Sequence, residues 1–133
     1  MIKQKVLFLC THNSSRTQMA EAFLRHLAGD RFDVVSAGGD EGEVSPAAVE
    51  VMREVGIDIS RQHPKDVAKF LGRRFTYVIH LCDRRKERSC PIFPGAIYRL
   101  HWDLEDPKNS VLAAKTVRDE IRRHIEDFVH NHG

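Results

Sequence analysis

The sequence predicts an α/β protein in which a four-stranded parallel sheet lies between two helical layers, a three-layer α/β/α architecture. Short apolar runs alternate with segments of helical period along the 133 residues, a pattern typical of parallel sheets covered on both faces. No repeat, linker or low-complexity segment interrupts the chain, so one domain spanning residues 1–133 is expected. A chain of this length can bury an ordinary hydrophobic core without disulfide bonds.

The elements of the first half have clear local signals. Residues 3–10 form an apolar run that predicts a buried strand, and residues 16–27 repeat apolar side chains at helical spacing until Gly29. A second strand is expected at 32–36, before the sequence Ala-Gly-Gly. A Ser-Pro pair further on is a typical helix start and predicts a helix from 46 to about 55.

The second half repeats the alternation. A short helical piece is expected at 66–71, followed by a strand at 75–82 and, after a turn containing Pro and Gly, a strand at 96–100. Residues 83–89 are highly charged and fit either a helix or a loop. The chain closes with a helix from 110 to about 130, whose apolar face consists of Ala114, Val117, Ile121, Ile125 and Phe128.

Composition excludes several classes of function. A net charge of +2 gives no basis for binding nucleic acid through its phosphates. No apolar run approaches the roughly 20 residues of a membrane span, and no signal peptide is recognisable, so no membrane association and a cytoplasmic location are expected. The three cysteines, Cys10, Cys82 and Cys90, are an odd number, which favours free thiols, either structural or reactive, over a secreted disulfide framework.

The loop that joins the first strand to the first helix is the candidate binding site. Such a loop points successive backbone N–H groups and the positive end of the helix into one concavity, which suits a tetrahedral oxyanion. Asn13 is expected to adopt the left-handed backbone of a tight anion loop, and Arg16 to bind two anion oxygens through its forked guanidinium. Cys10 is a candidate nucleophile because thiols at helix N-termini are acidified, and the Thr17 hydroxyl can donate to its thiolate.

The predicted oxyanion site comprises the strand-to-helix loop and the first turn of the helix, with no metal. The alternative without a binding function is a buried structural cysteine followed by a turn and a surface arginine. The residues of the predicted site are Cys10, Thr11, His12, Asn13, Ser14, Ser15, Arg16 and Thr17.

The stretch LFLCTHNSSRTQMAEAFLRH at 7–26 resembles the signature loop and first helix of low-molecular-weight protein tyrosine phosphatases and of the arsenate reductases that share their fold. The loop fits the pattern C-x-x-N-x-x-R-[ST] of both groups. The sequence RTQMAE at 16–21 is closer to the reductases, as are SAG at 36–38, VGIDIS at 55–60 and HWDLEDP at 101–107. The resemblance covers essentially the whole chain and implies the low-molecular-weight phosphatase fold.

The resemblance implies reduction of arsenate to arsenite by a relay of three cysteines. Cys10 would attack the bound arsenate, Cys82 would attack Cys10 and release arsenite, and Cys90 would form a Cys82–Cys90 disulfide. Thioredoxin is the implied electron donor, with glutaredoxin or a low-molecular-weight thiol left open. Asp106, in an Asp-Pro pair, would protonate the leaving oxygen, with Glu105 as the fallback acid.

Two other functions stay open at this point. A phosphatase with the same first step needs only one cysteine and would act on phosphomonoesters. Because the first step is shared, a reductase can retain weak phosphatase activity. However, the phosphatases usually carry a tyrosine after the Asp-Pro pair, and it packs on an aryl substrate. Lys108 and Asn109 follow the pair here, which disfavours hydrolysis of aryl phosphates. A sensor of oxyanions or redox state, without turnover, is the non-enzymatic alternative.

The segment between the second and third cysteines should change shape on oxidation. A helix over 82–90 would separate the two alpha carbons by about 12 Å, whereas a disulfide requires less than about 7 Å. This segment is one residue longer than the spacing associated with the family. Its basic residues are expected to favour thiolates and to attract an acidic partner; they are Arg84, Arg85, Lys86 and Arg88.

No cofactor is predicted, with one option left open. Some of the reductases that the chain resembles bind potassium near positions that correspond to Asn13, Glu21 and Ser36, and all three match here. The remaining ligand region, RQHPKD at 61–66, does not match clearly. The histidines lack metal-ligand spacing, and Trp102 is expected to be a packing residue.

Overall fold

The computed structural model describes residues 2–39, 43–83 and 90–132. Four parallel strands form one sheet in the order β2-β1-β3-β4. The strands are β1 (Gln4–Cys10), β2 (Phe32–Gly38), β3 (Phe75–His80) and β4 (Ala96–His101). The helices are α1 (Arg16–Ala28), α2 (Pro46–Glu54), α3 (Val111–His132) and the single 3-10 turn η1 (Val67–Phe70).

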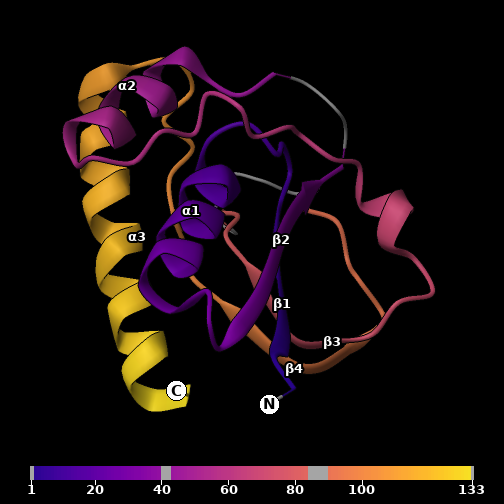
Figure 1. The fold of residues 1–133 in the computed structure, drawn as a ribbon. Coiled ribbons are helices and arrows are strands. Elements are labelled where there is room, and N and C mark those ends of the chain that lie inside the picture. Colours follow the sequence, from indigo (N-terminus) through magenta and orange to yellow (C-terminus); the bar gives the residue numbers. More distant parts are fainter. Residues whose placement is uncertain (1, 40–42, 84–89, 133) are drawn as a thin grey trace.

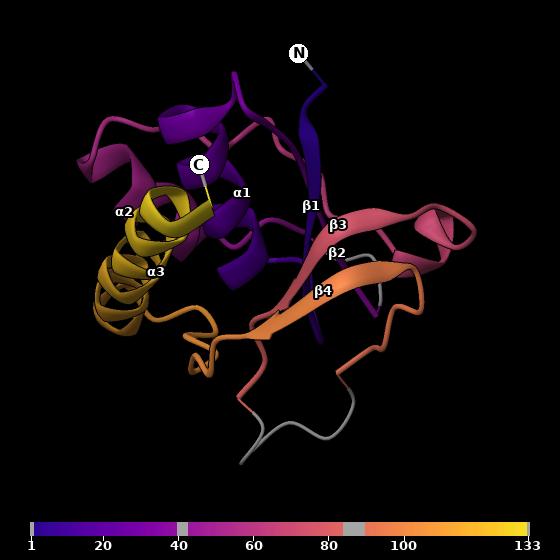
Figure 2. The ribbon, with the colours of Figure 1, turned by 90° about the horizontal axis from the view of Figure 1, so that it is seen from below.

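The side chains of β1 alternate between two apolar clusters, one on each face of the sheet. Val6 and Phe8 belong to the larger cluster, which α1, α2 and α3 cover, and Leu7 and Leu9 belong to the smaller cluster with Phe70 of η1. Figure 2 shows the three long helices together on one side of the sheet and η1 on the other. The predicted parallel α/β fold is confirmed, with a thinner second layer than the first.

The observed boundaries explain how the sheet presents its carboxyl edge. β2 runs two residues beyond the predicted end, because Gly38 pairs with Cys10 across the sheet and its N–H donates to the carbonyl of Lys65 at 2.9 Å. β3 ends at His80, so Cys82 follows the strand instead of ending it. The N–H of Leu81 still donates to the carbonyl of Leu9, which keeps this segment against β1.

The loop after β1 and the segment after β3 therefore emerge at one edge of the sheet, at the upper end of the molecule in Figure 1. The predicted packing role of Trp102, which follows β4, is confirmed: its ring stacks on His124 of α3 and lies against Phe8. In the part of the chain that the structure describes, none of the helices has the length and apolar character of a membrane span.

Candidate active site

Cys10 is the last residue of β1 and is completely buried. Its sulfur lies 3.6 Å from the hydroxyl oxygen of Thr17 in the first turn of α1, the contact that the sequence predicts. The sulfur also contacts the main-chain carbonyl oxygen of His12. A thiol S–H can donate to such a carbonyl, so the His12 backbone lies directly against the Cys10 sulfur.

The expectation for the Asn13 backbone is wrong. Among the described non-glycine residues, only Lys108 has a positive φ. Asn13 shapes the loop through its side chain instead: Nδ2 donates to the Thr17 hydroxyl at 2.6 Å, and Oδ1 accepts from the N–H of Lys65 at 2.8 Å and from Nε2 of Gln18 at 3.0 Å. A buried amide with these three partners fixes the loop between α1 and the segment before η1.

Arg16 is 1% exposed, which rules out the alternative of a surface arginine. Its Nη1 donates to the carbonyl of Leu81 at 3.2 Å and to that of Leu104 at 3.0 Å, and its Nη2 lies 3.9 Å from Oδ2 of Asp106. The fork-shaped contact between this guanidinium and a bound anion stays a prediction.

Cys82 stands beside the oxyanion loop. Its sulfur lies 3.7 Å from the hydroxyl of Thr11, the residue that follows Cys10. Cys82 is bonded to Cys90 as a disulfide, with 6.2 Å between their alpha carbons. The predicted pairing is thus present, and the family-atypical extra residue does not prevent it. The basic residues predicted to favour thiolates lie at 84–88, outside the described residues.

Asp106 comes to the loop from the segment that follows β4, the strand at one edge of the sheet. One carboxylate oxygen faces Arg16 and the other accepts the N–H of Lys108 at 2.9 Å. Lys108 adopts a φ of 52°, and its carbonyl accepts the hydroxyl of Ser45, the N-cap of α2. The N–H of Ser45 in turn donates to the carbonyl of Ser14. Ser45 therefore holds both the loop that carries Asp106 and the loop that follows β1.

The buried Ser15 hydroxyl is the one buried side-chain polar group among the described residues without a hydrogen-bond partner. It lies at the N-cap position of α1, in the loop predicted to bind an oxyanion. Buried hydroxyls normally have a hydrogen-bond partner. The Ser15 hydroxyl could donate a hydrogen bond to an anion bound in this loop. The His12 side chain, by contrast, is exposed.

Sequence reasoning missed the residues that hold this loop from behind. Gln18 donates to both oxygens of Asn13 and to the carbonyl of His63, and Gln62 donates to the side chain and carbonyl of Gln18. No local pattern marks these glutamines. A polar residue at the third position of α1, Gln18, is the one signal that could have suggested them.

Glu21 of α1 is buried, and two cationic side chains balance the charge of its carboxylate. Its Oε1 accepts the Ser36 hydroxyl at 2.7 Å and lies 3.7 Å from Nζ of Lys65, and its Oε2 pairs with Arg25 at 3.0 Å. Within residues 2–39, 43–83 and 90–132, no cluster of three or more His, Cys, Asp or Glu side chains is arranged to hold a metal ion.

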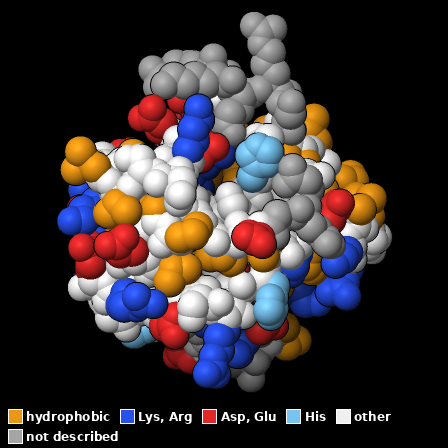
Figure 3. Space-filling model, turned by 90° about the horizontal axis from the view of Figure 1, so that it is seen from above, with side chains coloured by type: hydrophobic (Ala, Val, Ile, Leu, Met, Phe, Trp, Pro, Cys, Tyr) orange, Lys and Arg blue, Asp and Glu red, His pale blue; other side chains and the backbone are white. Residues whose placement is uncertain are grey.

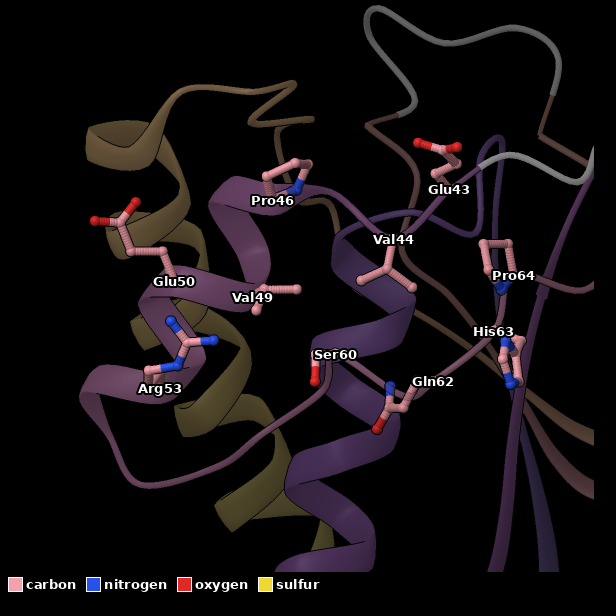
Figure 4. A pocket seen from close by; sticks show the side chains of 10 residues that line it. All are labelled: Glu43, Val44, Pro46, Val49, Glu50, Arg53, Ser60, Gln62, His63 and Pro64. Atoms are coloured by element: carbon pink, nitrogen blue, oxygen red, sulfur yellow. The ribbon is translucent and has the colours of Figure 1, made fainter.

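A pocket of about 710 Å³ lies between α2 and residues 60–64. Figure 4 shows Glu43, His63 and Pro64 at one end of it and Glu50 and Arg53 at the other. None of the predicted site residues lines this pocket. Seen from the carboxyl edge of the sheet, the surface interleaves acidic, basic and histidine side chains without a field of one sign (Figure 3).

Comparison with known proteins gives the same relationship throughout. Residues 5–132 match the family described as low molecular weight phosphotyrosine protein phosphatase. The chain is 37% identical over 129 residues to "Arsenate reductase 2" of Staphylococcus epidermidis, covering 96% of this chain and 98% of that protein. A solved structure described as "An arsenate reductase in the phosphate binding state" superposes with a TM-score of 0.84 at 34% identity, over 98% of this chain and 99% of that one. The "thioredoxin-dependent arsenate reductase" of Corynebacterium glutamicum gives a TM-score of 0.77 at 32% identity, over 97% of this chain and 61% of that one.

Proposed function

The chain belongs to the low-molecular-weight phosphotyrosine protein phosphatase family, and on that premise we propose that it reduces arsenate to arsenite with Cys10, Cys82 and Cys90. The relatives named arsenate reductases cover nearly the full length of the chain. A phosphatase of this family would need only the first of the three thiols, because water completes phosphoester hydrolysis.

The first two steps change the oxidation state of arsenic. The Cys10 thiolate attacks the arsenic of arsenate, an As–O bond breaks, and Asp106 protonates the leaving oxygen. Cys82 then attacks the Cys10 sulfur. The new S–S bond forms as the S–As bond breaks, its electron pair stays on arsenic, and As(V) leaves as As(III) arsenite.

The last two steps restore the enzyme. Cys90 attacks the Cys82 sulfur, which forms the Cys82–Cys90 disulfide and frees Cys10 as a thiolate. An external dithiol then supplies two electrons and reduces that disulfide.

The observation that carries this proposal is the position of Cys82, bonded to Cys90 while its sulfur is 3.7 Å from Thr11 of the oxyanion loop. A structural disulfide would have no reason to touch the nucleophile loop. A sulfur that is bonded to Cys90 and lies beside the residue after Cys10 has the position that a disulfide relay requires.

We assign the donor role to thioredoxin. Cys90 is partly exposed whereas Cys82 is fully buried, and Ile92, two residues after Cys90, is 81% exposed. An incoming dithiol therefore meets the Cys90 sulfur first, beside an apolar side chain that a protein donor can cover. A small thiol such as glutathione gains nothing from that side chain. Reversible use of the thiols also requires a reducing compartment, so we assign the protein to the cytoplasm.

The chain does not fit a resident potassium ion. Among the three matching positions, Asn13, Glu21 and Ser36, the carboxylate of Glu21 is the one charged group. It has the ammonium group of Lys65 on one oxygen and the guanidinium of Arg25 on the other. A further cation there would be repelled by both groups. We propose that Lys65 supplies the positive charge itself, from a chain segment whose backbone also binds Asn13.

The decisive experiment compares single turnovers of the reduced protein with arsenate. The wild type and Cys90→Ser should each release about one equivalent of arsenite per protein, because release needs only Cys10 and Cys82. Cys82→Ser should release none. With thioredoxin, thioredoxin reductase and NADPH present, only the wild type should continue to turn over.

p-Nitrophenyl phosphate serves as the parallel substrate. Its hydrolysis should be slow and indifferent to Cys82→Ser, since that reaction does not use the second thiol. Aryl-phosphate turnover without arsenite would identify a phosphatase, and phosphate binding without either product would identify a sensor. Faster recycling by glutaredoxin and glutathione than by thioredoxin would overturn the donor assignment alone.

A further inference from the structure

Two histidines lie side by side at the carboxyl ends of β3 and β4. His80 and His101 are register partners in the sheet, and their rings stack with centroids 5.9 Å apart and planes 14° apart. Both end a strand immediately before a segment of the site: His80 precedes Leu81 and Cys82, and His101 precedes the loop that carries Asp106.

The pair contacts both ends of the disulfide-bonded segment. Nε2 of His101 donates to the carbonyl of Cys82 at 2.7 Å, which fixes the proton on that nitrogen, and the same atom lies 3.2 Å from Oδ1 of Asp103. Nδ1 of His80 lies 3.8 Å from the sulfur of Cys90. One ring therefore holds the backbone at Cys82 while its neighbour touches the reacting sulfur eight residues on.

The surroundings of His80 keep its ring uncharged near neutral pH. Burial is the main reason that the pKa of His80 falls from its ordinary 6.5 to about 4, and the nearby His101 and Arg99 of β4 act in the same direction. A neutral imidazole carries one N–H, and donating that N–H to a thiolate stabilises the anion without creating a new charge in a partly buried place.

We propose that His80 is a catalytic residue of the third step, in which its Nδ1–H donates a hydrogen bond to the Cys90 thiolate and holds that sulfur against Cys82. This inference rests on the proposed relay and adds to it a residue outside the oxyanion loop. The Cys90 proton leaves to water before the attack. The Cys82–Cys90 bond then forms, the Cys10–Cys82 bond breaks, and the electron pair goes to Cys10.

A packing role for His80 makes different demands on the side chain. If the ring served only to stack on His101, phenylalanine would replace it well, because both are flat rings of similar size. If the Nδ1–H is what matters, asparagine would replace it better, since its amide nitrogen can donate from nearly the same position. The two substitutions therefore separate the two roles.

The first test measures the pKa of the Cys90 thiol without arsenate. Cys10→Ser combined with Cys82→Ser leaves Cys90 as the only one of the three cysteines, and the pH dependence of its alkylation by iodoacetamide reports its pKa. Adding His80→Phe should raise that pKa by about one unit, since a hydrogen bond to the thiolate is lost. Adding His80→Asn should shift it by less than about half a unit.

The second test follows single turnovers with all three cysteines present. Acid quenching and mass spectrometry count arsenite released and Cys82–Cys90 disulfide formed. In His80→Phe, arsenite release should match the wild type, while disulfide formation at pH 7 should be about tenfold slower and should approach the wild-type rate above pH 9, as expected for a less ionised thiol. His26→Phe, an exposed histidine on α1, is the matched control and should change neither quantity.

Equal Cys90 pKa values in the wild-type and His80→Phe backgrounds would overturn the inference, and so would an asparagine variant that behaves like phenylalanine. If His80→Phe fails to fold, His80→Ala supplies the same comparison. Because the alkylation test uses no arsenate, it fails or succeeds independently of the proposed function, which the arsenite count tests in the wild type.

Discussion

The sulfur of Cys82 and the hydroxyl of Thr11 lie 3.7 Å apart although 71 positions separate them in the chain. The parallel pairing of β1 with β3 creates this proximity, because both strands end at the same edge of the sheet. A thiol that follows β3 is thereby delivered to the neighbourhood of a thiol that ends β1. Strand order therefore brings the two segments that carry Cys10 and Cys82 to one place.

Gly38→Ala should loosen the oxyanion loop. A Cβ at this position would stand 2.5 Å from the backbone nitrogen of Asn13. Gly38 is held by its pairing with Cys10, and the Asn13 loop is held by the hydrogen bonds of the Asn13 side chain, so neither segment can move freely. We expect the free energy of unfolding to fall by about 1–3 kcal/mol and phosphate binding to the reduced protein to weaken. Urea denaturation and calorimetry measure the two effects. Gly39→Ala is the control, since its Cβ meets only the Thr11 carbonyl at 3.3 Å; equal effects of both substitutions would contradict the prediction.

Arg16→Lys should impair both folding and anion binding. A lysine cannot donate to the carbonyls of Leu81 and Leu104 from one flat group, so at least one buried carbonyl loses its partner. The expected loss in unfolding free energy is about 1–3 kcal/mol, with at least about tenfold weaker phosphate binding because the fork is absent. Arg122→Lys, which alters only an exposed pair with Glu126, should be nearly silent. Unchanged phosphate affinity in Arg16→Lys would refute the fork.

Lys65→Met should make the thermal stability of the protein depend on potassium, which the stability of the wild type should not do. Removing the ammonium group leaves the Glu21 carboxylate, 5% exposed, with one cationic neighbour in place of two. We expect the thermal midpoint to fall and then to recover as KCl replaces tetramethylammonium chloride at constant ionic strength, because a small cation can enter where Nζ stood. The wild type should respond equally to both salts. Lys115→Met, which removes an exposed partner of Glu54, controls for general charge effects; a potassium response in the wild type would disprove the assignment.

His80 should make the oxidised protein less stable in mild acid. Its pKa is about 4 in the folded protein and near 6.5 when unfolded, so below pH 6.5 the unfolded chain binds a proton that the folded one does not. Stability is therefore lost as the pH falls from 6.5 towards 4. The full shift corresponds to about 3 kcal/mol, which solvent screening of a partly exposed ring reduces to about 2 kcal/mol.

The measurement that isolates His80 is a difference. Urea unfolding of the disulfide form at pH 7 and pH 4.5 includes every carboxylate, but the carboxylates cancel when His80→Asn is subtracted. The variant should lose less stability than the wild type over that interval. Parallel losses in the two proteins would show that His80 does not hold a lowered pKa.

The sequence predicted those parts of the site that depend on contiguous residues. A strand, a polar loop and an amphipathic helix follow one another from Val6 to Leu27, so the positions of Cys10, Arg16 and Thr17 could be inferred from hydrophobic period alone. Asp106 and the second and third cysteines needed the family resemblance, since an Asp-Pro pair and two scattered thiols have no local signature.

The supporting residues could not be inferred because their roles depend on pairing across the sheet. Lys65 reaches Asn13 and Glu21 only because its segment is tied to the end of β2 through Gly38. His80 looks like an ordinary strand residue until β4 places His101 beside it. The backbone of Asn13 was predicted from its residue type, whereas the loop uses its amide instead, and a residue type cannot distinguish the two.

The guanidinium of Arg16 ties together parts of the chain that would otherwise move separately. One of its hydrogen bonds goes to the residue before Cys82, another to a residue two positions ahead of Asp106, and the side chain itself starts from the loop of Cys10. An anion bound to this guanidinium would therefore contact a group that is also hydrogen-bonded to the segments carrying Cys82 and Asp106. Loss of this one side chain would loosen three segments together, so the geometry of the empty site depends on the same residue that is predicted to bind the anion.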